Sequence, residues 1–205
     1  RLDEARNRLL VANTLSSSLT LVDCASRAVR NVPLAARVPQ YLKSEALAVD
    51  RRTGNAYVLG ERTLEVVFPG QGTSRSFATG KQFEMVAVDE ATGNAFLVGR
   101  ESRDLAWVEL KTGRMRRVRW CESEESAANL NQTPPPPPRK VVCDSEARLV
   151  AAVDGTTATL HLFAADGLRP LGKRTLGLEP GGRWHFAGYA RREKSLVLVK
   201  ETTAR

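Results

Sequence analysis

The sequence predicts an all-β fold built from repeated four-stranded antiparallel units. Two observations support this prediction: one hairpin recurs in near-identical copies, and no amphipathic helical stretch of any length competes with the strands. The clearest copies are Ala48–Gly60 and Ala87–Gly99, each an apolar strand, a polar turn containing Thr-Gly-Asn, and a second apolar strand. The turn glycine can take the positive φ that a tight hairpin requires.

The same hairpin recurs with more drift along the rest of the chain. Its copies are anchored by Asp3, Asp50, Asp89 and Asp144, and by Ala190 in the last copy, 39 to 55 residues apart. A third, alternating strand follows each complete hairpin, at Leu19–Val22, Leu64–Phe68, Leu105–Leu110 and Thr159–Phe163. A more polar fourth strand comes next, at Arg27–Val32, Ser74–Ala78, Arg114–Arg119 and Gly172–Leu176. Four short strands per repeat of this length are typical of a β-propeller blade.

The predicted blades cover residues 1–42, 43–80, 81–138, 139–182 and, as a partial blade, 183–205. The third blade contains a proline-rich insertion at 122–140, where Pro134–Pro138 lack the N–H groups that a sheet needs and should form an exposed loop. The first blade lacks most of its inner strand, and the last ends after two strands. We therefore expect a partial propeller of about four to five blades, with the remaining blades supplied by the rest of a longer chain.

Composition places the chain among ordinary core-forming proteins. Its 205 residues are 42% hydrophobic and 26% charged, which argues against wholesale disorder. No apolar run approaches the ~20 residues that a bilayer span needs, so we expect no membrane span. The opening residues Arg1–Glu4 carry no apolar core of a signal peptide.

The net charge of +8 raises the question of an acidic partner. The densest basic cluster is Lys111, Arg114, Arg116, Arg117 and Arg119. Successive side chains of a strand point to opposite faces, so one flat surface cannot present all of them. We predict a solvated edge strand there and do not expect nucleic-acid binding, while a basic surface for an acidic partner remains an alternative.

The three cysteines lack metal-site spacing, and only two histidines accompany them, so we expect no zinc site. Cys121 and Cys143 flank the proline-rich insertion, and a disulfide between them would close this loop in an oxidising compartment. The alternative is buried free thiols. Gly167–Arg174 resembles a phosphate-binding loop but has Arg174 where Ser or Thr is needed, so no cofactor is expected.

Candidate site residues lie just before the anchors, where the inner strands of a propeller begin. Equivalent positions carry Glu45, Glu84 and His185, and two residues earlier Lys43 and Arg183. Such positions converge on the central axis, so these five side chains are predicted to share a polar funnel at the channel mouth. The funnel either binds a polar ligand or is a water-filled channel without one.

The hairpins Asp3–Asn13, Asp50–Gly60 and Asp89–Gly99, with the following strand Ser18–Asp23, resemble the YVTN and NHL class of bacterial-type β-propeller repeats. This resemblance implies scaffolding, ligand binding or, in some branches, an enzyme at the channel mouth, and it favours a periplasmic or secreted location. The segment Pro180–Ala187 loosely resembles a blade entry of phosphogluconolactonase-like propellers.

The sequence thus favours a non-enzymatic binding or scaffold module that engages a protein or a polar ligand through its channel mouth and loops. One alternative is a lactonase-like hydrolase with Glu45, Glu84, Arg183 and His185 at its site. A second alternative is the basic surface described above.

Overall fold

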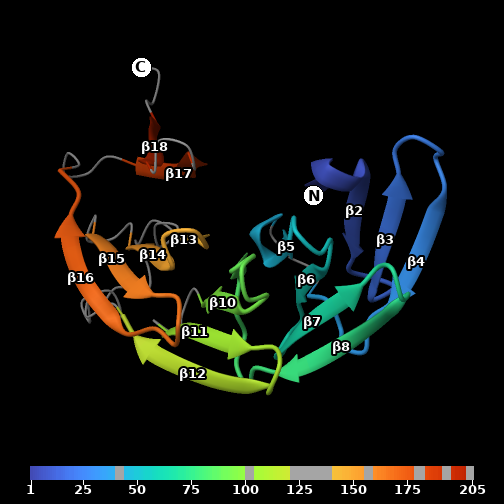
Figure 1. Ribbon diagram of the computed structural model, residues 1–205, viewed down its shortest axis with the longest axis horizontal. Coiled ribbons are helices and arrows are strands. Elements are labelled where there is room, and N and C mark those ends of the chain that lie inside the picture. The colour runs from blue at the N-terminus through green and yellow to red at the C-terminus, as the bar shows by residue number, and fades with distance from the viewer. Residues whose placement is uncertain are drawn as a thin grey trace, which may run out of the picture.

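The computed structural model is an open arc of antiparallel sheets, with the inner strands on its concave side and the outer strands on its convex side (Figure 1). It describes residues 1–39, 44–99, 104–120, 140–154, 159–177, 183–190 and 195–201. Four of the sheets have four strands each, and we call them blades 1 to 4 in chain order. Among the described residues the only helices are two short 3-10 turns, which confirms the all-β prediction.

Blade 1 consists of β1 (Leu2–Asp3), β2 (Arg8–Asn13), β3 (Ser18–Asp23) and β4 (Val29–Pro33), with the 3-10 turn η1 (Glu4–Arg6) between its first two strands. Blade 2 follows the 3-10 turn η2 (Ser44–Ala46) and consists of β5 (Leu47–Val49), β6 (Ala56–Leu59), β7 (Thr63–Phe68) and β8 (Thr73–Ala78).

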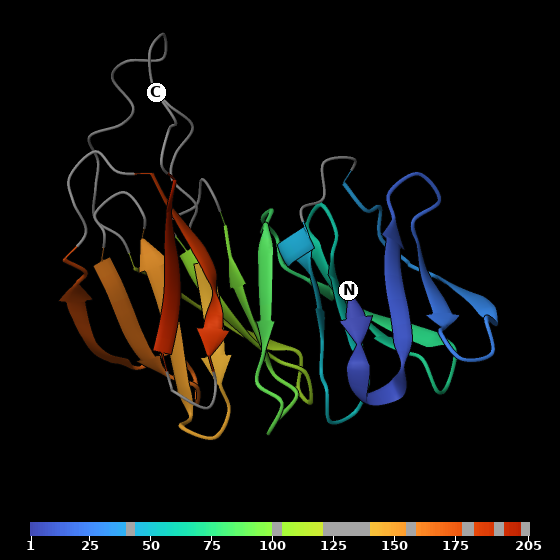
Figure 2. The same cartoon turned by 90° about the horizontal axis from the view of Figure 1, so that it is seen from above.

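Blade 3 consists of β9 (Met85–Val88), β10 (Ala95–Val98), β11 (Asp104–Glu109) and β12 (Arg114–Arg119). Blade 4 consists of β13 (Lys140–Asp144), β14 (Leu149–Asp154), β15 (Thr159–Ala164) and β16 (Pro170–Thr175). A final antiparallel pair, β17 (Arg183–Ala190) and β18 (Ser195–Glu201), lies at the far end of the arc. Figure 2 shows the successive sheets standing side by side.

The fourth strands of blades 1 and 4 each begin two residues away from the predicted start. β4 begins at Val29 and not at Arg27, because Arg27 has a φ of 60° and closes the preceding turn. β16 begins at Pro170, two residues earlier than predicted. A proline is tolerated there because it opens the outer edge strand of its sheet.

The anchor aspartates form the inner turns. The Asp50 carboxylate accepts hydrogen bonds from the backbone N–H of Arg52 at 2.9 Å and from the Thr53 hydroxyl at 2.6 Å. Asp89 accepts the equivalent bonds from Ala91 and Thr92. These side-chain acceptors satisfy turn N–H groups that strand pairing leaves unpaired, so the anchors are structural residues.

The fourth residue after each anchor has a left-handed backbone. It is a glycine with φ of 76° and 77° in blades 2 and 3, at Gly54 and Gly93, but Asn7 in blade 1 and Arg148 in blade 4. Glycine takes this conformation without strain, and asparagine takes it more readily than most residues. The hairpin geometry is therefore shared even where the sequence repeat has drifted.

Three hydrophobic clusters fill the spaces between successive blades. The cluster between blades 2 and 3 brings Tyr57, Leu64 and Phe77 against Val88 and Leu97, all buried. At each junction, one face of a blade packs against the blade that precedes it in the chain. The blade faces, and not the interior of any single sheet, form the core.

Candidate functional site

The inner strands of blades 1 to 4 enclose a pocket of about 270 Å³ on the concave side of the arc. Apolar residues of the inner strands alternate with exposed polar groups in its wall, and Arg1, Arg51 and Glu90 contribute charge. Its lining comes from the inner strands of four blades and two adjoining turns: Arg1, Leu2, Leu47, Ala48, Val49, Arg51, Ala87, Val88, Glu90, Val141, Val142 and Cys143. The pocket is therefore the described part of the propeller channel.

An ion pair joins two blades at the end of the pocket where the inner strands begin. The Lys140 Nζ donates to Glu45 Oε1, although the two residues are 95 positions apart. Glu45 lies in η2 just before β5, and Lys140 opens β13. The side chains are 28% and 16% exposed, so the pair is partly shielded from water. Attraction between such charges is stronger than on an open surface.

Glu84 lies between these two residues in the order of the blades. It immediately precedes β9, its N–H donates to the Val98 carbonyl at 2.9 Å, and it is half-buried. Glu45 and Glu84 stand five residues before their anchors, as the repeat predicts. The described mouth therefore contains two carboxylates and one lysine, contributed by three successive blades.

The other predicted mouth residues are placed only in part. Arg183 and His185 belong to β17, of which the backbone course is described. Lys43 lies outside the described residues. The shared funnel of all five residues stays a prediction.

Lys140 is the mouth residue that the repeat did not indicate. It stands four residues before its anchor, while the equivalent of Glu45 and Glu84 is Arg139, which lies outside the described residues. The sequence signal that could have identified Lys140 is a basic residue at the start of an inner strand. Its pairing with Glu45 depends on how the arc brings blades 2 and 4 together.

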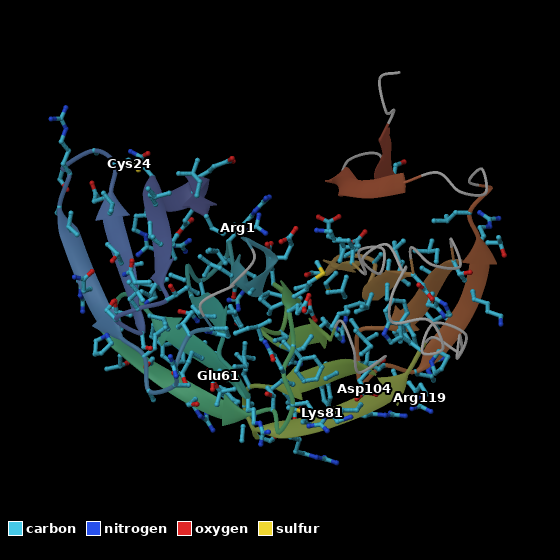
Figure 3. The ribbon with its side chains drawn as sticks, turned by 180° about the vertical axis from the view of Figure 1, so that it is seen from behind. Arg1, Cys24, Glu61, Lys81, Asp104 and Arg119 are labelled. Carbon is cyan, nitrogen blue, oxygen red and sulfur yellow. The ribbon has the colours of Figure 1, made fainter. Side chains whose placement is uncertain are left out.

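The four arginines of the predicted basic cluster lie on β12, which is the outer edge strand of blade 3, as expected, and Lys111 lies in the preceding turn. Figure 3 shows Arg119 on the convex side of the arc, near the ion pair between Lys81 and Asp104, whose charged atoms are 2.9 Å apart. Arg117 donates to the Thr79 carbonyl of the neighbouring blade. At least one cationic group of the cluster thus serves the contact between blades.

Other outer-strand arginines make similar contacts. Arg30 of blade 1 donates to the Pro69 carbonyl at 2.9 Å, and Arg75 of blade 2 donates to the Leu110 carbonyl at 3.3 Å. Each acceptor is the residue that directly follows the third strand of the next blade. The arginine-rich composition therefore reflects, in part, how blades are joined.

Two of the three cysteines lie among the described residues. Cys143 is buried and lines the pocket, and Cys24 is exposed. Cys121 lies outside the described residues, so its disulfide with Cys143 stays a prediction. No group of three His, Cys, Asp or Glu residues suited to a metal ion occurs in the described part of the chain. No helix in that part has the length and apolar content that a bilayer crossing requires.

Comparison with solved structures identifies the architecture. The chain is similar to apo AztD from Citrobacter koseri, with 14% identity and a TM-score of 0.60 over 97% of this chain and 49% of that one. It is also similar to hydrazine synthase of Kuenenia stuttgartiensis, with 15% identity and a TM-score of 0.60 over 83% and 46% of the two chains. A chain of the mitotic checkpoint complex matches with 11% identity and a TM-score of 0.60, over 83% and 47%.

These likenesses show the fold, a β-propeller, and the chain spans about half the length of the structures that it matches. The four-stranded sheets agree with a partial propeller. No protein-family model matches the chain, and no curated protein sequence matches it.

Proposed function

We propose that this chain is part of a non-enzymatic β-propeller module of the YVTN/NHL type, which binds a polar ligand or a protein segment at its channel mouth. The supporting observation is the ion pair between Glu45 and Lys140, which spans from blade 2 to blade 4 at the end of the pocket. A ligand with a charged group could replace either partner of this pair. The pocket, whose lining combines apolar residues such as Leu47 and Val141 with charged ones, would receive the rest of the ligand.

In this proposal the mouth recognises charged groups of the ligand through acidic and basic side chains that come from separate blades. Glu45 and Glu84 would attract cationic groups, and Lys140 would hold an anionic one. We include His185 in the proposed binding set because it occupies the repeat position of Glu45 and Glu84, and we include Lys43 and Arg183 because they stand two residues earlier in their repeats. The hydrolase alternative would require Arg183 and His185 to reach one reacting atom together with the two glutamates.

The test uses two polar probes of opposite charge, citrate and spermidine, titrated into the ¹⁵N-labelled chain. We expect at least one probe to shift the backbone amide resonances of Glu45, Glu84 and Lys140. In the Lys140→Met variant the affinity should fall if the probe that binds is citrate, and rise if it is spermidine. The change should be at least ~10-fold, the size expected for removing one charged hydrogen bond of about 1.4 kcal/mol.

The matched control is Lys81→Met, which removes the lysine of the ion pair with Asp104 on the convex side. This variant should bind the probe as the wild type does. The proposal is wrong if neither probe binds, or if the shifted resonances cluster on the convex side. Steep weakening by salt that Lys140→Met leaves unchanged would favour the basic-surface alternative.

A further inference from the structure

The turn end of the pocket, opposite the channel mouth, contains one arginine and one glutamate from neighbouring blades. Arg51 directly follows the anchor Asp50 of blade 2, and Glu90 directly follows the anchor Asp89 of blade 3. Both residues line the pocket. Blades 2 and 3 each pack against a neighbouring blade on both faces, so the two residues come from the enclosed middle of the arc.

Two consecutive arginines of this turn have different roles. The Arg52 Nε donates to the Glu90 carbonyl of blade 3 at 2.8 Å and thus serves the contact between blades. The Arg51 guanidinium makes no hydrogen bond or ion pair within the described ranges, and the residue is exposed. A guanidinium carries a full charge and five N–H donors. The contact between blades therefore does not account for Arg51, whose donors are available to a ligand.

Neighbouring turns fix the backbone at both positions. Arg6 of blade 1 donates to the carbonyls of Arg51 and Arg52, at 2.9 and 2.7 Å. The Glu90 N–H donates to the Ser145 hydroxyl oxygen of blade 4 at 2.8 Å. Together with the bond from Arg52 to Glu90, these contacts link four inner turns in one chain of hydrogen bonds. The two pocket residues thus project from joined turns, and a preorganised site of this kind binds at a lower entropic cost.

The wall beside these charged groups is formed by the inner strands β5, β9 and β13. Each is the inner edge strand of its sheet and has a neighbouring strand on one side only. Half-buried aliphatic side chains of these strands, Ala48, Ala87 and Val142, line the pocket. The pocket volume of about 270 Å³ is close to the lower limit of ligand pockets, which is ~300 Å³. The pocket therefore suits a single small molecule.

We propose that the turn end of the pocket binds a small aliphatic molecule that carries both a carboxylate and an ammonium group, such as a free α-amino acid. The Arg51 guanidinium donates two parallel hydrogen bonds to the ligand carboxylate, an arrangement in which arginine binds carboxylates strongly. The Glu90 carboxylate accepts a hydrogen bond from the ligand ammonium group. The aliphatic part of the ligand packs on the wall of the inner strands. This site is separate from the ion pair at the channel mouth, and the inference does not rest on a ligand there.

The combination of an arginine and a glutamate selects for both charges of the ligand. A ligand that lacks the ammonium group desolvates the Glu90 carboxylate without compensating it. A ligand that lacks the carboxylate does the same to the Arg51 guanidinium. Only a molecule with both groups compensates both side chains.

The test titrates three ligands with the same aliphatic part into the ¹⁵N-labelled 205-residue chain. They are L-leucine, 4-methylpentanoate, which lacks the amine, and 3-methylbutylamine, which lacks the carboxylate. We expect L-leucine to shift the backbone amide resonances of Arg51, Val88 and Glu90. It should bind at least ~10-fold more tightly than either analogue, the size expected for the loss of one charge-assisted hydrogen bond.

Substitutions separate the roles of the two charged side chains. In Arg51→Met the affinities for L-leucine and 4-methylpentanoate should fall at least ~10-fold, while 3-methylbutylamine should bind as it does to the wild type. In Glu90→Gln the affinities for L-leucine and 3-methylbutylamine should fall, while 4-methylpentanoate should bind at least as tightly as before. The ligand that each variant still binds shows that its pocket is folded.

The matched controls are Arg114→Met on β12 and Glu146→Gln in the inner turn of blade 4. Both positions are exposed, and neither residue lines the pocket. Neither substitution should change the affinity for L-leucine. The proposal is overturned if L-leucine leaves the three amide resonances unchanged or binds no more tightly than the analogues. It is also overturned if Arg51→Met and Glu90→Gln weaken all three ligands alike.

Discussion

The junction between blades 1 and 2 and the junction between blades 2 and 3 share one register, yet each buries a different polar group. At the second junction Tyr57 is fully buried and its hydroxyl donates to the Gly93 carbonyl of blade 3 at 2.8 Å. At the first junction Glu65 is fully buried, and neither carboxylate oxygen has a hydrogen-bond partner among the described residues. The fully buried Tyr57 side chain of the second junction is hydrogen-bonded, and the fully buried Glu65 side chain of the first is not.

Glu65 belongs to the first junction because of its register. It pairs with Val58 on the same face as Val67, and both valines pack in the cluster that contains Leu10 and Leu19 of blade 1. The position equivalent to Glu65 in blade 3 is Ala106, which is fully buried at the second junction. The comparison shows that packing alone does not require a carboxylate at this position. The unpaired Glu65 carboxylate is therefore an energetic cost that the second junction does not carry at the equivalent position.

The largest effect is expected when a second carboxylate is introduced at the position of the second junction that is equivalent to Glu65. Ala106→Glu should lower the free energy of unfolding by about 3–5 kcal/mol, because it buries an uncompensated charge and overfills a packed space. Guanidinium denaturation measures the change. Ala78→Glu, at an exposed position of β8, is the control and should stay within about 0.5 kcal/mol of the wild type. Equal stabilities of the two variants would show that the second junction accepts a carboxylate.

A smaller effect of opposite sign is expected at the first junction. Glu65→Met keeps the side-chain length but removes the unpaired oxygens, and should raise the free energy of unfolding by about 1–3 kcal/mol. Glu61→Met, where the glutamate side chain is 59% exposed, should change little in the same denaturation experiment. If Glu65→Met destabilises the protein, the carboxylate makes a favourable contact in solution and the two junctions are alike.

The smallest effect concerns the satisfied contact. Tyr57→Phe should cost about 1 kcal/mol near neutral pH, since the Gly93 carbonyl loses its donor. Burial raises the pKa of the Tyr57 phenol well above its ordinary value of 10.0. The folded state thus keeps the phenol proton where the unfolded chain releases it.

This pKa shift has a defined sign for stability. The contribution of Tyr57 is fully present below about pH 10 and is lost as the pH rises further. Denaturation midpoints measured between neutral pH and pH 11 should therefore fall less steeply for Tyr57→Phe than for the wild type. Parallel curves would mean that the phenol ionises equally well in both states.

The strands could be predicted from sequence because their signals are local. The anchor aspartates and the Thr-Gly-Asn turns specify each inner hairpin within about ten residues, as Asp50 and Gly54 illustrate. The burial of Glu65 could not be predicted in this way. Alternation along β7 suggests a solvent-facing glutamate only when one sheet face is open, whereas blade 2 is covered on both faces.

For the candidate site, the sequence indicates positions and not contacts. Glu45 and Glu84 lie just before successive inner strands, while the site that they are predicted to share stays a prediction. The sequence did not indicate that Lys140 pairs with Glu45, because that contact depends on the curvature of the arc across an intervening blade. Positions within a repeat follow from local spacing, but partners across repeats follow from how the blades are stacked.

The hydrogen bonds between blades also bear on how such a chain can evolve. The guanidinium groups of Arg6, Arg30, Arg52 and Arg75 all donate to main-chain carbonyls of the next blade. A carbonyl is present whatever side chain its residue carries, and the acceptors here include an arginine, a proline, a glutamate and a leucine. The receiving blade can therefore change its turn residues without losing the contact, which allows duplicated units to diverge one at a time while the assembled arc persists.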